Sequence, residues 1–250
     1  CAGSGRALMG GLAARRRAAL ARLWSGLPPM RGVGGVVRDL LAQGPIADIA
    51  LATPERPEQG MDCLRAQGVH VVATGLQHGT VTAVLDGAPY EITTLRRDEE
   101  TDGRHAVVSW TQDWREDARR RDFTLNAMSV DQAGVLYDYF SGQADLAAEH
   151  VRFVGDPARR IEEDALRILR FFRFYGRYGQ GGADPQAVQA ISSGVALLDG
   201  LSVERVWMEL RRILAGPNVA TLLPLMEQTG VLVRILPEGY TLERCARLVD

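Results

Sequence analysis

The segment Asp48-Ile49-Ala50 has the spacing of a metal-binding strand but carries one carboxylate instead of two. Residues two apart in a strand point to the same face, so acids at both positions could hold magnesium ions that bridge a triphosphate and an attacking hydroxyl. Here Asp48 is the candidate metal ligand, and Ala50 marks the position of a missing one. An aspartate at a strand end can also cap a turn, and the pair by itself favours that simpler interpretation.

Glu91 is a second candidate for the same chemistry. It lies in a strand-like run at residues 90–94 between apolar neighbours, where a glutamate needs a partner. It could be the remaining carboxylate of a metal site, or it could pair with an arginine such as Arg96. The sequence leaves both interpretations open.

A glycine pair, Gly34-Gly35, runs into a helical pattern at residues 36–43. Two glycines let the backbone approach a phosphate closely, and the start of a helix offers free N–H groups and a positive dipole end. Arg38 falls in the first turns of that helix and could pair with the same phosphates. Many turns contain a glycine pair, so this pattern alone is weak evidence.

A dense group of charges at residues 117–127 includes Arg121, Asp122 and Asn126. It forms either a salt-bridged helix start or a site in which arginines reach a triphosphate while Asp122 or Asn126 braces them.

Asp164 and Arg167 are three residues apart, so a helix would place them on one face. They form either a surface ion pair worth roughly a few tenths of a kcal/mol or a protein template for a base. In such a template the carboxylate accepts from an exocyclic amine and the guanidinium donates to the adjacent ring nitrogen. Cytosine and adenine offer that pair of groups. Guanine and uracil present a carbonyl in place of the amine and would leave buried partners unsatisfied.

Composition gives no global attraction to nucleic acid, because the 250 residues carry a net charge of −2. All 29 basic residues are arginine, which suits bidentate phosphate and base contacts, although genome composition could produce the same bias. Residues 151–177 hold seven arginines against four acids, which indicates either a polyanion partner or a solvated helix face. No apolar run reaches the roughly 18 residues that span a bilayer, so no membrane partner is expected.

Cysteine usage predicts a cytoplasmic protein. Cys1, Cys63 and Cys245 are far apart and odd in number, which argues against a disulfide framework or a zinc site. No secretory signal is recognised at the start of the chain.

Periodicity and turn signals predict a mixed α/β head at about 1–143 and a helical region at about 144–250. In the head we expect helices at 7–25, 36–43 and 57–67, strands at 30–33, 46–51, 69–73 and 135–139, a hairpin of 80–85 with 88–95 across Asp86-Gly87, and a polar loop at 102–105. Later helices are expected at 157–178, 185–198, 203–215 and 217–229. The expected fold class is α+β, a mixed sheet with flanking helices followed by an all-helical neck and body.

Taken together, these segments resemble the class II tRNA nucleotidyltransferase (CCA-adding enzyme) and bacterial poly(A) polymerase family. The resemblance runs in order from about residue 33 to residue 179 and rests on Gly34-Gly35-Val36-Val37-Arg38-Asp39, the strand at Asp48, Thr74-Gly75-Leu76-Gln77-His78-Gly79-Thr80-Val81-Thr82, Glu91-Ile92-Thr93-Thr94, Asp102-Gly103-Arg104-His105, Arg120-Arg121-Asp122-Phe123-Thr124-Leu125-Asn126-Ala127 and Glu163-Asp164 through Arg173. Residues 202–214 resemble the family's next helical segment.

The resemblance implies a nucleotidyltransferase-type sheet, a neck with its base-recognition helix at about 157–178, and addition of C and A to tRNA 3′ ends, or of A tails to RNA, from CTP and ATP. It implies Mg²⁺ as cofactor with Asp48 as ligand, so the candidate catalytic group is Asp48, Glu91 and the position of Ala50. It implies that Gly34, Gly35, Arg38 and Arg121 bind the triphosphate, that Asp164 and Arg167 read the base, and that Arg170 and Arg173 support the site. The reaction would be in-line attack of an RNA 3′-hydroxyl on the α-phosphate, releasing pyrophosphate.

One departure limits the expected activity. The family has a second metal-binding aspartate where this chain has Ala50, and losing one carboxylate from a two-metal site predicts activity lower by orders of magnitude. The sequence therefore predicts an impaired CCA-adding enzyme. The alternatives are a bacterial poly(A) polymerase and a catalytically dead nucleotide- or RNA-binding relative.

Overall fold

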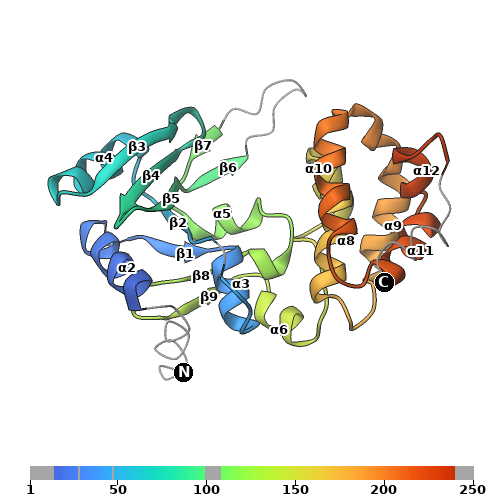
Figure 1. Ribbon diagram of the computed structural model, residues 1–250, viewed down its shortest axis with the longest axis horizontal. Helices are drawn as coiled ribbons and strands as arrows, with labels where there is room; N and C mark the ends of the chain where they lie inside the picture. The colour runs from blue at the N-terminus through green and yellow to red at the C-terminus, as the bar shows by residue number, and fades with distance from the viewer. Residues whose placement is uncertain (1–13, 28, 47, 99–107, 240–250) are drawn as a thin grey trace. The chain divides into compact units, whose positions relative to one another are not determined.

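The computed structural model describes residues 14–27, 29–46, 48–98 and 108–239 (Figure 1). The chain divides into two compact units. The first, called the head, comprises Cys1–Arg121 and Leu125–Gln143, and the second, called the helical unit, comprises Asp122–Thr124 and Ala144–Asp250. The loop expected at 102–105 lies outside the described residues.

Within its described residues, the head is built on a mixed sheet of seven strands in the order β3-β4-β5-β2-β1-β8-β9. These strands are β1 (Arg31–Val33), β2 (Ala50–Thr53), β3 (His70–Gly75), β4 (Thr80–Leu85), β5 (Ala88–Thr94), β8 (Met128–Val130) and β9 (Leu136–Asp138). β2 and β5 run parallel, and the other neighbours pair antiparallel. A separate ribbon pairs β6 (Arg96–Asp98) with β7 (Val108–Trp110).

Helices α2 (Ala14–Gly26), α3 (Gly35–Leu41) and α4 (Pro57–Ala66) cover one face of this sheet. The buried cluster between them includes Leu20, Leu23, Val37, Leu51, Leu64 and Ile92. Because strand residues alternate between faces, Ala50 and Glu91, the neighbours of Leu51 and Ile92, point to the opposite face. On that face Trp114, from α5 (Trp114–Arg119), packs in the small apolar cluster that Ala50 joins.

The predicted hairpin is confirmed, because β4 and β5 pair from Thr80 opposite Thr93 to Leu85 opposite Ala88. Asp86 and Gly87 at the turn have φ values of 52° and 75°. Positive φ at both central residues is typical of a type I′ turn, whose twist matches that of the strands.

The strand predicted at 46–51 is displaced, because β2 begins at Ala50 and ends at Thr53. The carbonyl of Ile46 accepts a hydrogen bond from Nη1 of Arg16 in α2 at 2.7 Å instead of pairing in the sheet. Asp48 therefore precedes the strand.

After β9, the described residues form helices joined by loops and no further strand of the sheet. These helices are α6 (Gly142–Ala147), α7 (Pro157–Glu163), α8 (Leu166–Tyr178), α9 (Pro185–Gly194), α10 (Val203–Leu214), α11 (Val219–Gln228) and α12 (Val231–Ile235). The single helix predicted at 157–178 is wrong, since α7 and α8 are separate. The helix predicted at 185–198 ends at Gly194 and continues as the 3₁₀ helix η3 (Val195–Gly200).

An aromatic cluster forms part of the core of the helical unit. Phe123 is fully buried, with ring centroids 4.9 Å from Phe153 and 5.2 Å from Phe174. Phe171 stacks on Phe153 at 5.9 Å. With its sheet head and helical second unit, the α+β class is confirmed.

Candidate functional site

The glycine pair turns the chain from β1 into α3. Gly34 has φ 65° and ψ −120°, a conformation that L side chains rarely adopt. A Cβ atom added there would lie 2.9 Å from Nη1 of Arg121. Glycine at this position therefore allows the guanidinium of Arg121 to approach the loop closely.

Arg38 is buried behind the loop, with 8% of its surface exposed. Its Nη1 donates to Oδ1 of Asn126 at 2.5 Å, and its Nε and Nη2 donate to Oδ1 of Asp39 at 3.0 and 2.9 Å. A Cβ atom on Gly35 would lie 3.5 Å from Nη2 of Arg38. The structure therefore places Arg38 directly behind the second glycine.

Asp117 anchors Arg120 and Arg121 in the head, and sequence reasoning did not select it. Its buried carboxylate accepts from Nη2 of Arg121 at 3.0 Å, pairs with Nη2 of Arg120 at 2.8 Å, and accepts from the backbone N–H of Arg96 at 3.3 Å. Burial alone would raise the pKa of the Asp117 carboxyl, but the guanidinium groups of Arg121 and Arg120 hold it below its usual range. Burial lowers the pKa of Arg120 against the opposing effect of Asp117. The i,i+3 and i,i+4 spacing is the signal that could have found this residue.

Asn126 links the two halves of this group, because its backbone carbonyl accepts from Nη1 of Arg121 at 3.4 Å while its side chain accepts from Nη1 of Arg38 at 2.5 Å. We call the linked side chains of Arg38, Asp39, Asp117, Arg120, Arg121 and Asn126 the arginine cluster. The structure thus brings the predicted residues Gly34, Gly35, Arg38 and Arg121 together in the head.

The carboxylate candidates lie on or beside the face of the sheet that α2, α3 and α4 leave open. Ala50 is the register partner of Glu91 in the parallel pair β2–β5, so the two side chains are neighbours on one face. Glu91 and Asp48 are exposed and Ala50 is half-buried. Arg96 donates to the carbonyl of His78 at 3.2 Å, and no ion pair joins it to Glu91 in the described part of the chain.

These residues do not fit the two-metal site that the resemblance implies. Among the described residues, no group of three or more His, Cys, Asp or Glu side chains could hold a metal ion. Mg²⁺ takes oxygen ligands in octahedral geometry. On the open face the register partners of the exposed Glu91 are Thr82 in β4 and Ala50 in β2, so neither adds a second carboxylate, and the exposed Asp48 lies before β2.

The helical unit holds the second group of candidates. Asp164 ends α7 in an extended conformation (φ −154°, ψ 103°), and its Oδ1 accepts from the backbone N–H of Leu166 at 3.1 Å. The prediction that Asp164 and Arg167 share one helix face is therefore wrong, since Asp164 lies in the break before α8. Arg167 donates to Oε2 of Glu163 at 2.6 Å and to the carbonyl of Arg160 at 2.9 Å.

The carboxylate of Asp164 is held from α10. Nη2 of Arg205 lies 3.1 and 3.2 Å from its two oxygens. The side chains are 34% and 49% exposed, so the pair adds only about 0–1 kcal/mol to stability, and its main effect is to orient the carboxylate. Sequence reasoning did not single out Arg205, because nothing local connects it to a residue 41 positions away.

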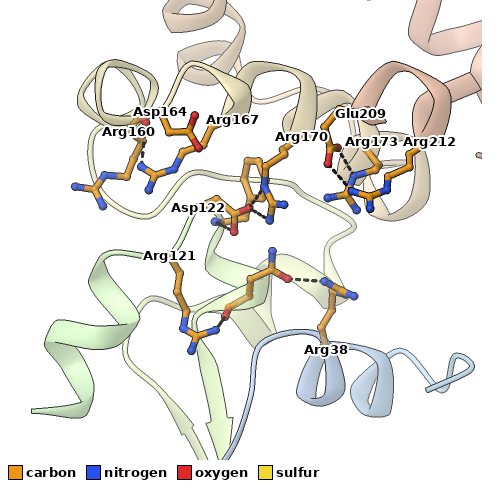
Figure 2. Close-up of polar contacts among 12 residues, drawn as sticks. Arg38, Arg121, Asp122, Arg160, Asp164, Arg167, Arg170, Arg173, Glu209 and Arg212 are labelled. Atoms are coloured by element: carbon orange, nitrogen blue, oxygen red, sulfur yellow. Dashed lines mark hydrogen bonds and ion pairs between the residues drawn. The ribbon is translucent and has the colours of Figure 1, made fainter. Parts of the chain in front are cut away.

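Arg170 and Arg173 face two different acids of the helical unit (Figure 2). Arg170 donates from Nε and Nη2 to Oδ2 of Asp122 at 2.8 and 2.5 Å. Arg173 donates to Oε2 of the buried Glu209 in α10 at 2.7 Å, and Arg212 donates to its other oxygen at 2.8 Å. Burial lowers the pKa of Arg173 and the Glu209 carboxylate raises it, with burial prevailing. These contacts fix the orientation of α8.

Two family models match the chain in succession. The Poly A polymerase head domain matches residues 30–152, and the probable RNA and SrmB-binding site of polymerase A matches residues 183–241. The mouse (Mus musculus) protein named CCA tRNA nucleotidyltransferase 1, mitochondrial, is 45% identical over 218 residues, which cover 86% of this chain and 50% of the relative. The chain belongs to the class II CCA-adding enzyme family.

Two solved structures of related enzymes are similar to most of this chain. The Bacillus stearothermophilus CCA-adding enzyme in complex with CTP superposes with a TM-score of 0.81 at 34% identity, covering 95% of this chain and 58% of that one. A tRNA nucleotidyltransferase complexed with a primer tRNA and an incoming ATP analog gives a TM-score of 0.71 at 27% identity, covering 88% of this chain and 63% of that one. The chain thus spans about half the length of the curated CCA-adding enzymes it matches. Among its described residues, no helix is both long and apolar enough to cross a membrane.

Proposed function

We propose that this chain is the head and neck part of a template-independent RNA nucleotidyltransferase, with a head at 1–143 and a helical neck and start of body at 144–250. The single observation that carries the proposal is the arginine cluster built against Gly34 in the head. A triphosphate carries several negative charges, and arginines present planar forks that match its oxygens. A buried, mutually fixed set of arginines beside a glycine turn suits that ligand.

The proposed roles follow the two units. In the head, Gly34 and Gly35 let the triphosphate approach the backbone, and Arg38 and Arg121 compensate its charge. In the helical unit, Asp164 and Arg167 read the amine and ring nitrogen of cytosine or adenine. The substrates we propose are CTP, ATP and the 3′ end of tRNA, in line with the CTP, ATP analog and primer tRNA named for the two related structures.

Arg170 and Arg173 are proposed to support base reading. Their ion pairs with Asp122 and Glu209 fix α8, which carries Arg167.

The proposed reaction is in-line attack of the RNA 3′-hydroxyl on the α-phosphate with release of pyrophosphate, a step in which positioning and charge compensation supply most of the catalysis. Ala50 leaves the carboxylate set incomplete, so we propose that transfer is impaired while nucleotide binding is retained. The same alanine supports a second candidate, a relative that binds nucleotide or RNA and has lost the chemistry. A bacterial poly(A) polymerase remains the alternative product class.

The deciding experiment measures incorporation of labelled CTP and ATP, with Mg²⁺, into a tRNA that lacks its CCA end. The chain is compared with its Ala50→Asp variant, and Ala50→Asn serves as a control of similar size without the charge. We expect extension only by Ala50→Asp, because that change places a carboxylate next to Glu91. A product ending in CCA identifies tRNA repair, and a long A tail identifies poly(A) synthesis. If neither the unaltered chain nor Ala50→Asp extends the tRNA while both bind nucleotide, the missing carboxylate does not explain the deficit, and the binding-only candidate is favoured.

We also propose a cytoplasmic location. It rests on the cysteine usage, in which Cys63 is a free, exposed thiol. Because the mouse relative is named as mitochondrial, fractionation of source cells is the measurement that decides the compartment.

A further inference from the structure

Asn126 lies where the two arginines nearest the glycine pair meet. It belongs to the short 3₁₀ helix η2 (Thr124–Asn126) and is 7% exposed. Its side-chain oxygen accepts from Nη1 of Arg38 at 2.5 Å, and its backbone oxygen accepts from Nη1 of Arg121 at 3.4 Å. One residue therefore receives guanidinium groups that come from two separate parts of the chain.

The charge of the arginine cluster makes a neutral acceptor important at this position. Its three arginines face the two aspartates Asp39 and Asp117, which leaves one net positive charge. A carboxylate at position 126 would form an ion pair with Arg38 and reduce that net charge to zero. Over a few ångströms in a partly buried site, one unit charge changes the attraction for a polyanion substantially.

We infer that Asn126 is a positioning residue for the triphosphate, a neutral acceptor that aligns Arg38 and Arg121 without cancelling the positive charge of the cluster. The inference rests on the proposed function, because it assumes that a nucleoside triphosphate binds at the glycine pair. In this role Asn126 acts on the triphosphate through Arg38 and Arg121 and does not itself contact the nucleotide.

Asn126→Asp separates this role from a merely structural one. Aspartate has nearly the same shape as asparagine and keeps the oxygen that accepts from Arg38. The hydrogen bond that orients Arg38 would therefore be preserved, and as a charge-assisted bond it would be stronger than the neutral one. The positioning role predicts the opposite result for the ligand, because the cluster no longer carries net positive charge.

The experiment is a titration of CTP and of ATP by calorimetry, together with urea unfolding of the same proteins. We expect Asn126→Asp to raise the Kd for both nucleotides at least tenfold while the unfolding midpoint stays equal or rises. Asn126→Asp combined with Asp39→Asn restores the net charge and should recover most of the affinity. Gln59→Glu, an equal charge change at an exposed position of α4, should leave the Kd within twofold.

The outcomes are distinguishable. If the unaltered chain binds neither nucleotide, the proposed function fails. If the unaltered chain binds both nucleotides and the Kd of Asn126→Asp is within twofold of its Kd, the positioning role is overturned and Asn126 serves the fold alone. If Asn126→Asp does not fold, Asp39→Asn alone decides: the added net positive charge should lower the Kd, and an unchanged or higher Kd overturns the inference.

Discussion

Replacing Asp117 by asparagine tests the idea that one buried carboxylate holds Arg120 and Arg121 in place. The Asp117 side chain is 3% exposed, and those of Arg120 and Arg121 are 16% and 19% exposed, so solvent screens these pairs little. Removing one partner of a buried ion pair costs about 3–5 kcal/mol. Because asparagine keeps one acceptor oxygen, we expect Asp117→Asn to lower the free energy of unfolding by about 2–4 kcal/mol.

The same variant makes a prediction about pH. The pKa of Asp117 in the folded protein lies below its ordinary value of 3.8, so the ionised carboxylate stabilises the folded state. This contribution is complete above pH 3.8 and is lost as the pH falls through the folded-state pKa. The stability difference between the unaltered protein and Asp117→Asn should be constant from about pH 7 to about pH 5 and should narrow below pH 3.8.

Urea unfolding followed by tryptophan fluorescence measures both effects, since Trp24 and Trp114 lie in the head. Asp62→Asn, at an exposed position of α4, is the matched control and should change stability by less than about 0.5 kcal/mol. The reasoning is refuted if Asp117→Asn costs no more than Asp62→Asn, or if the difference stays constant below pH 3.8.

Two further substitutions test other contacts by the same unfolding measurement. Gly34→Ala should cost about 1–3 kcal/mol, because alanine is strained at φ 65° and its Cβ would lie 2.9 Å from Nη1 of Arg121. Gly35→Ala, where the added Cβ meets nothing closer than 3.5 Å, should cost less than about 0.5 kcal/mol, and equal losses at the two glycines would contradict this explanation. Glu209→Gln should cost about 1–3 kcal/mol, because it leaves the partly buried Arg173 without its counter-charge. A loss near zero would show that solvent already screens that charge.

Local signals predicted the parts of the fold whose cause is local. Asp86-Gly87 predicted the β4–β5 hairpin, because both residues can adopt positive φ. Of the three-residue strands, β1 and β9 fall within the predicted strands at 30–33 and 135–139, whereas β6, β7 and β8 were missed because no alternating or β-rich run marks them in the sequence. In the structure β6 pairs with β7, and β8 pairs with β1 and β9.

The break at Asp164 could not be predicted for a similar reason. The alternation of arginines and apolar residues continues through 157–178, and no glycine or proline marks an end there. At the break the Asp164 side chain accepts from the Leu166 N–H at the start of α8, and Arg205 of α10 pairs with the same carboxylate.

The candidate site shows the same limit. The sequence left Asn126 and Asp122 as alternative partners of the head arginines, and the structure joins Asn126 to Arg38 and Arg121 and joins Asp122 to Arg170. Asp117 was not selected from sequence and is distinguished from the neighbouring acids by its burial. Asp113, Glu116 and Asp117 are all acids of one short stretch, and only Asp117 is buried.

The two units are interleaved along the sequence, and this affects how the protein can be divided. Residues 122–124 lie within the head sequence but belong to the helical unit. There the Val154 N–H donates to the carbonyl of Asp122, and the Thr124 N–H donates to the carbonyl of Arg152, each at 3.0 Å. A fragment that starts after the last head strand would lack Phe123, which is fully buried among the aromatic rings of that unit. A cut near residue 143 would therefore leave the helical fragment without part of its core and leave Phe123 on the head fragment without its aromatic partners. Any fusion or domain exchange that uses this protein therefore has to keep the two units together in one fragment.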